Sequence, residues 1–397
     1  MKHYILSIFA LCIAFNAAFA QGLTRVKPED AGMDSKRLSK VDDAVNEAIN
    51  SRLIPGAVVA VVRHKNLVYL KAFGNKQVYP DTVAMTTNTV FDLASVSKPT
   101  STATALMILL EQGKLRLRDN VSRYIPDFKP WTSADGKQRE QIEIIHLLTH
   151  TSGLPPYADV EALKKIYSVP NPDGLITHIS NVKRNNPPGT VFDYSCLNFI
   201  TLQRIIETIS GMSLKEFSQK NIFTPLGMKH TDYNPSGETL ALVAPTEKQA
   251  DGSVLKGLVH DPLARVMNGG ISGNAGVFST AEDLSVLAAM LINKGQINGV
   301  RILSPLTVEK MTTVPKGYEK FGRTLGWDSY SAYKTFGDIF GTKSYGHTGY
   351  TGTSITIDPE SETAVIILAH RVHPEDKGSM GRFRDVVANA VAGAVVK

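Results

Sequence analysis

Cysteine is scarce in this chain of 397 residues, which contains only Cys12 and Cys196. Because Cys12 falls within an expected export signal, the mature chain would keep a single cysteine and could form no internal disulfide. A disulfide scaffold is therefore excluded, and a hydrophobic core must stabilise the fold. Beyond residue 20 the sequence also lacks a long apolar run, a basic run interleaved with aromatic residues, internal repeats and low-complexity tracts. These absences argue against a membrane span after signal cleavage and against nucleic-acid binding.

The first 20 residues have the pattern of a secretory signal. Lys2 precedes an apolar run over residues 4–15, and Ala-Phe-Ala at 18–20 forms a small-x-small cleavage site. The run is too short to span a membrane. We therefore expect a signal peptide over residues 1–20, cleavage after Ala20, and a secreted or periplasmic protein. Loss of Lys2 would lower the formal net charge from +6 to +5. A net positive charge indicates either affinity for anionic surface material or only good solubility.

The rest of the chain alternates strand and helix patterns, and its 43% hydrophobic, 20% charged composition is ordinary for a soluble protein. Strands are predicted at 56–62, 67–73, 353–357 and 363–369. Helices are predicted at 35–51, 141–148, 197–210, 214–221, 280–293 and 382–396. The order indicates an α+β fold whose antiparallel sheet is built from both termini and flanked by helices. We expect a discontinuous sheet domain over 21–112 and 301–397, and a mostly helical domain over 113–300.

Ser95 and Lys98 open a further predicted helix. Apolar residues recur at helical spacing from residue 103, Gly113 marks the end, and Pro99 favours a start close to Ser95. Residues three apart share one helix face, so the Lys98 amine can reach the Ser95 hydroxyl. The pair is a candidate nucleophile with its base. The alternative is an N-capping serine beside a solvated lysine.

Two later segments add polar groups that suit a cleft. Tyr194 lies on an expected loop before a helix, where nearby cations would let its hydroxyl accept a proton. Glycines flank His347 and Thr348 at the edge of an expected strand, which would let a substrate approach the backbone closely. These two side chains could bind a substrate carboxylate or carbonyl, and Tyr350 offers its N–H. A packing tyrosine and a glycine-rich strand start are the structural alternatives.

A serine and lysine at a helix start, a mid-chain loop tyrosine and a late His-Thr-Gly strand resemble, in this order, the penicillin-recognising serine hydrolases. That family contains class C β-lactamases, D-alanyl-D-alanine carboxypeptidases and related esterases. The resemblance covers nearly all of the mature chain and implies a β-lactamase-like (DD-peptidase) fold. Further matching segments are HLLTHTSGL at 146–154, VHDP at 259–262, GNAGVFSTAEDL at 273–284 and GHTGYTGT at 346–353.

The resemblance implies a double-displacement acyl transfer. Ser95 would attack a carbonyl, Lys98 and Tyr194 would shuttle the proton, and water would release the acyl-enzyme. The oxyanion hole maps onto the N–H groups of Ser95 and Tyr350. No metal or organic cofactor is implied, the expected partner is a small-molecule or peptidoglycan-type substrate, and the oligomeric state is left open. The other substrate-binding positions are His347, Thr348, Gly349 and Cys196.

Two residues depart from the family pattern. His347 stands where strong β-lactamases of this type carry lysine, and a mostly neutral imidazole should bind a carboxylate less well. Cys196 replaces a common asparagine or aspartate, and a thiol is a poor hydrogen-bonding group; nothing in the pattern activates it as a nucleophile. Both departures favour hydrolysis of esters or D-Ala-D-Ala-type peptides. A class C-type β-lactamase and a catalytically weak penicillin- or wall-binding protein are the alternatives.

The remaining histidines are given structural interpretations. His146 and His150 have the spacing of zinc ligands on a helix, but the glutamate of the metalloprotease motif is absent. His370 and His373 follow a predicted strand and are expected to be structural or surface groups. Arg371 between them is a candidate cationic anchor for a substrate.

Overall fold

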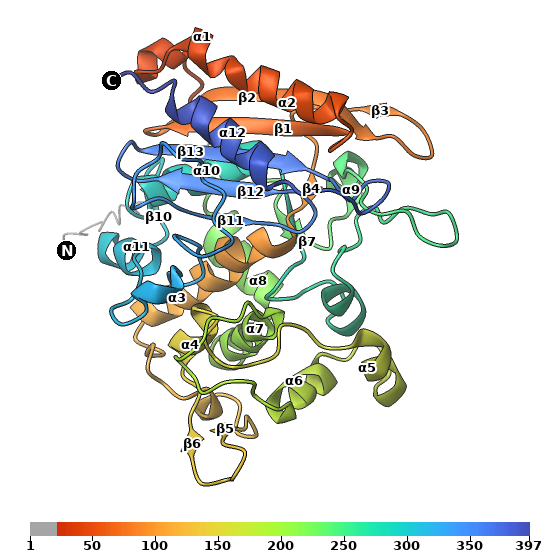
Figure 1. Cartoon of the computed structure of the whole chain (residues 1–397), viewed down its shortest axis with the longest axis vertical. Helices are drawn as coiled ribbons and strands as arrows, with labels where there is room; N and C mark the ends of the chain where they lie inside the picture. The colour runs from red at the N-terminus through yellow and green to blue at the C-terminus, as the bar shows by residue number, and fades with distance from the viewer. Residues whose placement is uncertain (1–21) are drawn as a thin grey trace, which may run out of the picture.

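A six-stranded antiparallel sheet made from both ends of the chain forms one layer of the molecule (Figure 1). The computed structural model describes residues 22–397, so the expected signal peptide lies outside the described residues. The strand order is β11-β12-β13-β1-β2-β3, which joins N-terminal and C-terminal strands through the pairing of β1 with β13. This confirms the predicted α+β fold. The strands are β1 (Gly56–Arg63), β2 (Asn66–Gln77), β3 (Val83–Ala84), β11 (Tyr345–Thr348), β12 (Ser354–Asp358) and β13 (Thr363–Ala369).

The central strand β1 is buried on both faces, because helices cover the sheet on each side. Successive side chains of a strand point to opposite faces. Val59 and Val61 accordingly join the apolar cluster under the terminal helices, whereas Val58 and Ala60 join the larger core on the other face. A strand enclosed in this way needs apolar residues at every position, which explains the continuous valine-rich run.

Three helices from the two termini cover one face of the sheet (Figure 1). The helix expected at 35–51 is divided at Ser39, whose hydroxyl donates to the Lys36 carbonyl and competes with helical hydrogen bonding. The helix expected at 382–396 already ends before Gly393. These helices are α1 (Ser35–Leu38), α2 (Lys40–Asn50) and α12 (Gly381–Ala392).

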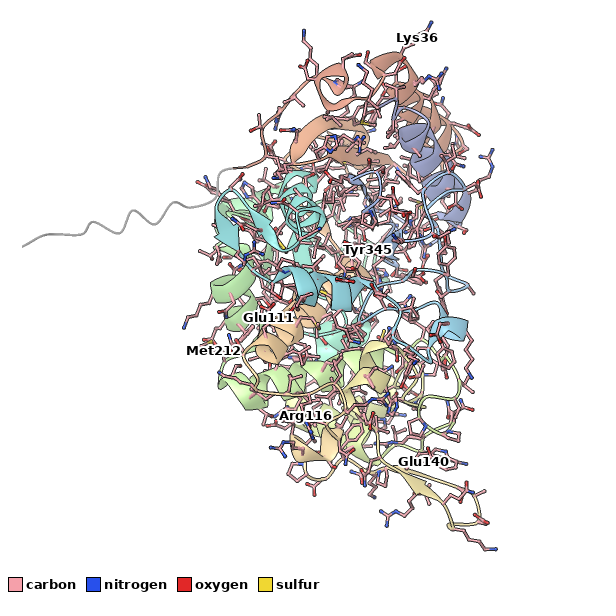
Figure 2. The ribbon with its side chains drawn as sticks, turned by 90° about the vertical axis from the view of Figure 1, so that its left-hand side faces the viewer. Lys36, Glu111, Arg116, Glu140, Met212 and Tyr345 are labelled. Carbon is pink, nitrogen blue, oxygen red and sulfur yellow. The ribbon has the colours of Figure 1, made fainter. Side chains whose placement is uncertain are left out.

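Helix α10 (Ala281–Ile292) covers the opposite face of the sheet and separates it from a largely helical layer. Figure 1 places this layer below the sheet, and the side-on view in Figure 2 puts Glu140 at the far end of the molecule from Lys36. Its helices are α3 (Thr104–Glu111), α4 (Ile144–Leu148), α5 (Val160–Ile166), α6 (Pro172–Asn181), α7 (Cys196–Ser210), α8 (Leu214–Ser218) and α11 (Pro305–Thr312). Helix α9 (Gly237–Leu242) lies beside the sheet, near β4 (Phe91–Asp92) (Figure 1).

Seven short strands connect these helices. One three-stranded sheet, in the order β4-β8-β7, lies beside the turn that carries Ser95, and two hairpins complete the set. The strands are β4 (Phe91–Asp92), β5 (Trp131–Thr132), β6 (Arg139–Glu140), β7 (Asp232–Tyr233), β8 (Val277–Ser279), β9 (Gln296–Ile297) and β10 (Val300–Arg301).

Two elements cross the expected domain boundaries. Helix α10 falls within 113–300 but packs on β1 and β13, and α3 falls within 21–112 but packs on α7. The second face of the sheet needs an apolar cover, and α10 supplies it. The boundaries at 112 and 300 stay a prediction. Between residues 22 and 397, no helix combines the length and apolarity that crossing a bilayer requires.

Candidate active site

Ser95 lies on a tight turn between β4 and α3. A short 3₁₀ turn covers Ala94–Val96 and a π-helical turn covers Lys98–Ala103, so regular α-helix begins only at Thr104. Ala94 has a positive φ of 47°, an uncommon conformation for a residue with a side chain. Its N–H donates to the Asp92 carboxylate at 2.9 Å. The expected helix start near Ser95 is therefore present, but as a turn of mixed geometry rather than a regular first turn.

Lys98 is fully buried and directs its ammonium group at Ser95. Its Nζ lies 2.9 Å from Ser95 Oγ and 2.9 Å from the Asn274 carbonyl oxygen. Cys196 Sγ lies 3.7 Å away. A lysine ammonium has three donors, and these three groups can accept all of them. The local i,i+3 geometry expected from the sequence is what brings the first pair together.

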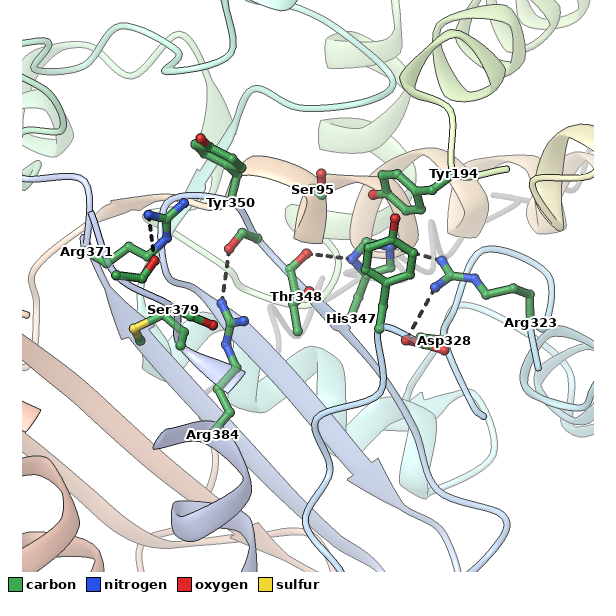
Figure 3. Close-up of a pocket in the computed structure, with 14 residues that line it drawn as sticks. Ser95, Tyr194, Arg323, Asp328, His347, Thr348, Tyr350, Arg371, Ser379 and Arg384 are labelled. Atoms are coloured by element: carbon green, nitrogen blue, oxygen red, sulfur yellow. Dashed lines mark hydrogen bonds and ion pairs between the residues drawn. The ribbon is translucent and has the colours of Figure 1, made fainter. Parts of the chain in front are cut away.

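Tyr194 lies beside Ser95 (Figure 3). Lys98 Nζ is 5.1 Å from the centroid of the Tyr194 ring, and the Arg323 guanidinium is 5.6 Å from it. His150 stacks on the ring with centroids 4.3 Å apart. The imidazole accepts the Ser195 N–H at Nδ1, so His150 is a packing support for Tyr194.

Burial sets the protonation of the groups around Ser95. Burial raises the pKa of Cys196 although Lys98 lowers it, so the thiol is protonated at neutral pH. Burial lowers the pKa of Lys98, but negative charge on Cys196 and Tyr194 would raise it by more, and the net direction is upward. Burial, together with the cations Arg323 and Lys98, holds the pKa of His150 well below its usual value. Lys98 therefore lies beside a neutral Cys196 thiol and a neutral His150 imidazole.

His347, on β11, lines the pocket but has internal partners at both ring nitrogens. Nδ1 lies 2.9 Å from the Thr348 carbonyl, and Nε2 lies 3.4 Å from Arg323 Nη2. Burial and the nearby Arg323 hold its pKa well below the usual value, which agrees with the expected neutral imidazole. The cation next to His347 is Arg323, which the sequence did not indicate. Arg323 is 1% exposed and pairs with Asp328 at 3.5 Å.

The turn after β11 approaches the turn that carries Ser95. A Cβ on Gly349 would lie 2.5 Å from the Leu93 carbonyl oxygen, so only glycine fits there. The Gly349 N–H donates to the Thr353 carbonyl at 2.8 Å and is not available to a substrate. Among residues 22–397, neither the Ser95 N–H nor the Tyr350 N–H donates to another residue. These are the two groups expected to form an oxyanion hole.

Two further arginines line the same pocket from the C-terminal segment (Figure 3). Arg371 pairs with Asp376 and lies over the Tyr350 ring, so its charge is already neutralised. Arg384 is 8% exposed and donates from Nη2 to the carbonyls of Gly349 and Thr353. Within the described part of the chain it forms no ion pair, and burial lowers its pKa to about 10. Of these two arginines, Arg371 has an acidic partner and Arg384 has none among the described residues.

The pocket has a volume of about 290 Å³ and is lined both by Ser95 and Tyr194 and by residues of β11 and the C-terminal segment. Cys196 does not line it but lies behind Ser95, next to Lys98. The expected substrate contact of Cys196 is therefore replaced by a contact with Lys98. The lining residues are Ser95, Tyr194, Arg323, Asp328, Tyr333, His347, Thr348, Gly349, Tyr350, Arg371, Gly378, Ser379, Met380 and Arg384.

The other histidines have structural contacts, as expected. His146 Nδ1 accepts the Glu143 N–H at the start of α4. His370 contacts the Pro245 carbonyl, and His373 contacts the Thr246 carbonyl and accepts the Val78 N–H. In the region from residue 22 onward, no cluster of three or more His, Cys, Asp or Glu side chains could hold a metal ion.

The model of the Beta-lactamase family matches residues 41–389. The chain belongs to this family. A protein named D-alanyl-D-alanine carboxypeptidase from Salmonella agona (strain SL483) is 33% identical over 377 residues, which cover 88% of this chain and 86% of that protein. As a member of the Beta-lactamase family, the chain is a serine hydrolase. It is similar to named carboxypeptidases and to a hydrolase with promiscuous acyltransferase activity.

Solved structures that are similar to this chain share its fold. EstCE1, described as a hydrolase with promiscuous acyltransferase activity, superposes with a TM-score of 0.73 at 26% identity, covering 90% of this chain and 99% of EstCE1. The octameric penicillin-binding protein homologue from Pyrococcus abyssi gives a TM-score of 0.69 at 26% identity, covering 89% and 76% of the two chains.

Proposed function

We propose that this chain is an exported hydrolase in which Ser95, Lys98 and Tyr194 form and hydrolyse an acyl-enzyme. The 2.9 Å contact between Lys98 Nζ and Ser95 Oγ, beside the Tyr194 ring and at the edge of the pocket, carries the proposal. Export rests on the signal pattern over residues 1–20.

The reaction proceeds in two displacements. Ser95 Oγ bonds to the substrate carbonyl carbon, and Lys98 and Tyr194 pass the serine proton to the leaving alcohol or amine as its bond to the acyl carbon breaks. Water then attacks the acyl carbon, a carboxylic acid leaves, and Ser95 regains its proton. The N–H groups of Ser95 and Tyr350 stabilise the oxyanion in both steps, and loss of one such donor typically costs about 100- to 1000-fold in rate.

The substrate class follows from Arg384. A buried guanidinium without an acidic partner is costly, and a substrate carboxylate would offset that cost. The first turn of α12, whose helix dipole also favours an anion, lies next to it at the pocket. We infer a carboxylate-bearing substrate, as in D-Ala-D-Ala-type peptides or esters of similar shape. The neutral His347 and the thiol at Cys196 support slow β-lactam turnover.

Purified mature protein should be offered nitrocefin, a p-nitrophenyl ester and a fluorescent penicillin. We expect ester turnover or stable penicillin labelling in the wild type, and loss of both in Ser95→Ala with little change in melting temperature. Most activity surviving in Ser95→Ala would refute the nucleophile assignment. Rapid nitrocefin hydrolysis would favour a β-lactamase. No turnover or labelling in any of the three assays would favour a wall-binding protein.

A further inference from the structure

The two N–H groups of the proposed oxyanion hole come from loops at opposite ends of the sequence. Ser95 follows the Asp92-Leu93-Ala94 segment, and Tyr350 lies in the turn between β11 and β12. An oxyanion hole works only if both donors lie where the oxygen becomes negatively charged. Something must therefore hold the two loops at a set separation.

Two buried threonine hydroxyls connect these loops directly. Thr351 Oγ1 donates to the Asp92 carbonyl at 2.9 Å, and Thr353 Oγ1 donates to the Leu93 carbonyl at 2.8 Å. Both threonines are fully buried. The two acceptors are neighbouring carbonyls in the segment that leads into Ser95, and the two donors lie on either side of Gly352, next to Tyr350.

The Asp92 side chain holds the same segment from the other side. One carboxylate oxygen accepts the Ala94 N–H at 2.9 Å, and the other accepts the His260 N–H at 2.6 Å. The first bond maintains the positive φ of Ala94, the residue before Ser95. Asp92 therefore fixes the nucleophile turn through its carboxylate and the opposing turn through its carbonyl.

The opposing turn has no freedom to move closer. Gly349 already approaches Leu93 so closely that a Cβ would lie 2.5 Å from its carbonyl oxygen. Arg384 holds the carbonyls of Gly349 and Thr353 from the sheet side. The two threonine hydroxyls hydrogen-bond the turn directly to the Asp92-Leu93 segment and so oppose movement away from Leu93.

We propose that Thr351 and Thr353, bonded to the Asp92 and Leu93 carbonyls, are positioning residues that set the separation of the Ser95 and Tyr350 N–H groups. This inference rests on the proposed function. We call the two hydrogen bonds from Thr351 and Thr353 the clamp. Neither hydroxyl touches the substrate, so loss of the clamp should weaken stabilisation of the oxyanion and leave substrate binding nearly unchanged. The expected signature is a lower kcat at constant KM.

The test compares Thr351→Val, Thr353→Val and the double variant with Thr351→Ser and Thr353→Ser, on a neutral p-nitrophenyl ester. We expect kcat to fall by about tenfold in each valine variant and by more in the double variant, which is less than the about 100- to 1000-fold cost of losing an oxyanion donor outright, because the donor is displaced and not removed. KM should stay within about twofold of the wild type, and serine, which keeps the hydroxyl, should restore kcat. Thr356→Val, a buried β12 threonine not bonded to Asp92 or Leu93, is the matched control and should keep wild-type kcat.

Affinity for a boronic acid inhibitor provides a second readout, because its tetrahedral adduct uses the oxyanion hole. It should weaken in parallel with kcat. Unchanged kcat in the valine variants, or serine variants as impaired as valine variants, would overturn the clamp. If the double variant does not fold, the single Thr351→Ala and Thr353→Ala variants decide by the same criteria. If Ser95→Ala is inactive while every clamp variant is normal, only this inference fails; if Ser95→Ala is active, the proposed function fails.

Discussion

The two sides of the pocket are built in different ways. The catalytic side, made of Ser95, Lys98 and Tyr194, consists of side chains that contact one another directly. The substrate side, made of the turn after β11 with Arg371 and Arg384, consists of backbone groups held by buried side chains. Each side holds a buried cation among neutral acceptors, but of the two only Arg384 lines the pocket.

This difference separates two contributions to catalysis. Groups that touch the reacting atoms should determine kcat, whereas the free charge of Arg384 should determine which substrates bind. Substitutions on the two sides should therefore affect different kinetic constants.

The largest effects are expected on the catalytic side. Lys98→Met and Tyr194→Phe each remove a group in the proton path, and kcat for an ester should fall by about 100- to 10,000-fold. Stopped-flow measurement of the acylation step in each variant checks this, with circular dichroism confirming folding. More than a tenth of wild-type kcat in either variant would remove that residue from the proton path.

On the substrate side, Arg384→Gln should reduce the preference for anionic substrates. The ratio of kcat/KM for a depsipeptide with a terminal carboxylate to that for a neutral ester should fall by about tenfold, consistent with loss of one charge-assisted hydrogen bond. The ratio cancels any effect of the lost carbonyl contacts on the oxyanion turn. Arg382→Gln, an exposed position on the same helix, is the control. An unchanged ratio would show that Arg384 is only structural.

A smaller effect is expected behind Ser95. Cys196→Asn places an amide beside Lys98, where the thiol now lies 3.7 Å away. Because an amide donates and accepts better than a thiol, turnover of amide or lactam substrates should rise by a few-fold. Nitrocefin and a D-Ala-D-Ala peptide are the substrates to compare. A fall with both would show that the thiol is required as it stands.

The smallest effect is expected from α4, a helix that supports the site through its packing on α7. His146 lies in the first turn of α4, and burial lowers the pKa of His146 to about 4. Between pH 6.5 and 4 the unfolded chain binds this proton more tightly, so stability falls as pH falls through that window. Buried Asp92 and Asp283, whose pKa values burial raises to about 6, act in the opposite direction.

The contribution of His146 alone is isolated by His146→Asn, which keeps an acceptor for the Glu143 N–H. Between pH 7 and pH 5, the loss of unfolding free energy should be about 2 kcal/mol smaller in this variant than in the wild type. Urea titrations at the two pH values measure both. Equal losses would show that His146 does not couple folding to protonation.

Much of the fold could be predicted because its signals are local. The valine-rich run of β1 and the periodic pattern of α7 each lie within one short segment, and the predicted ranges agree with Gly56–Arg63 and Cys196–Ser210. Predictions were weaker at ends and breaks, as at Ser39, where a single side-chain hydrogen bond divides a helix. Ser95 and Lys98 could be paired for the same local reason, since three residues on a helical turn span one contact.

Arg323 and Arg384 could not be found in this way. Nothing in the sequence separates Arg384, in an amphipathic helix, from the exposed Arg382 two residues earlier, and no motif marks Arg323. His347 was correctly expected to be neutral, but its partner Arg323 depends on how the segment before β11 returns to the sheet.

Short segments of the chain were enough to predict its strands and helices and the contact between Ser95 and Lys98, because each depends on neighbouring residues, and the motifs spaced along the chain indicated the family. Folding had to be known to see which arginine is left without an acid, where Cys196 lies, and how Thr351 and Thr353 reach Asp92 and Leu93. Those properties arise from burial and from contacts between distant segments, which exist only after the chain has folded.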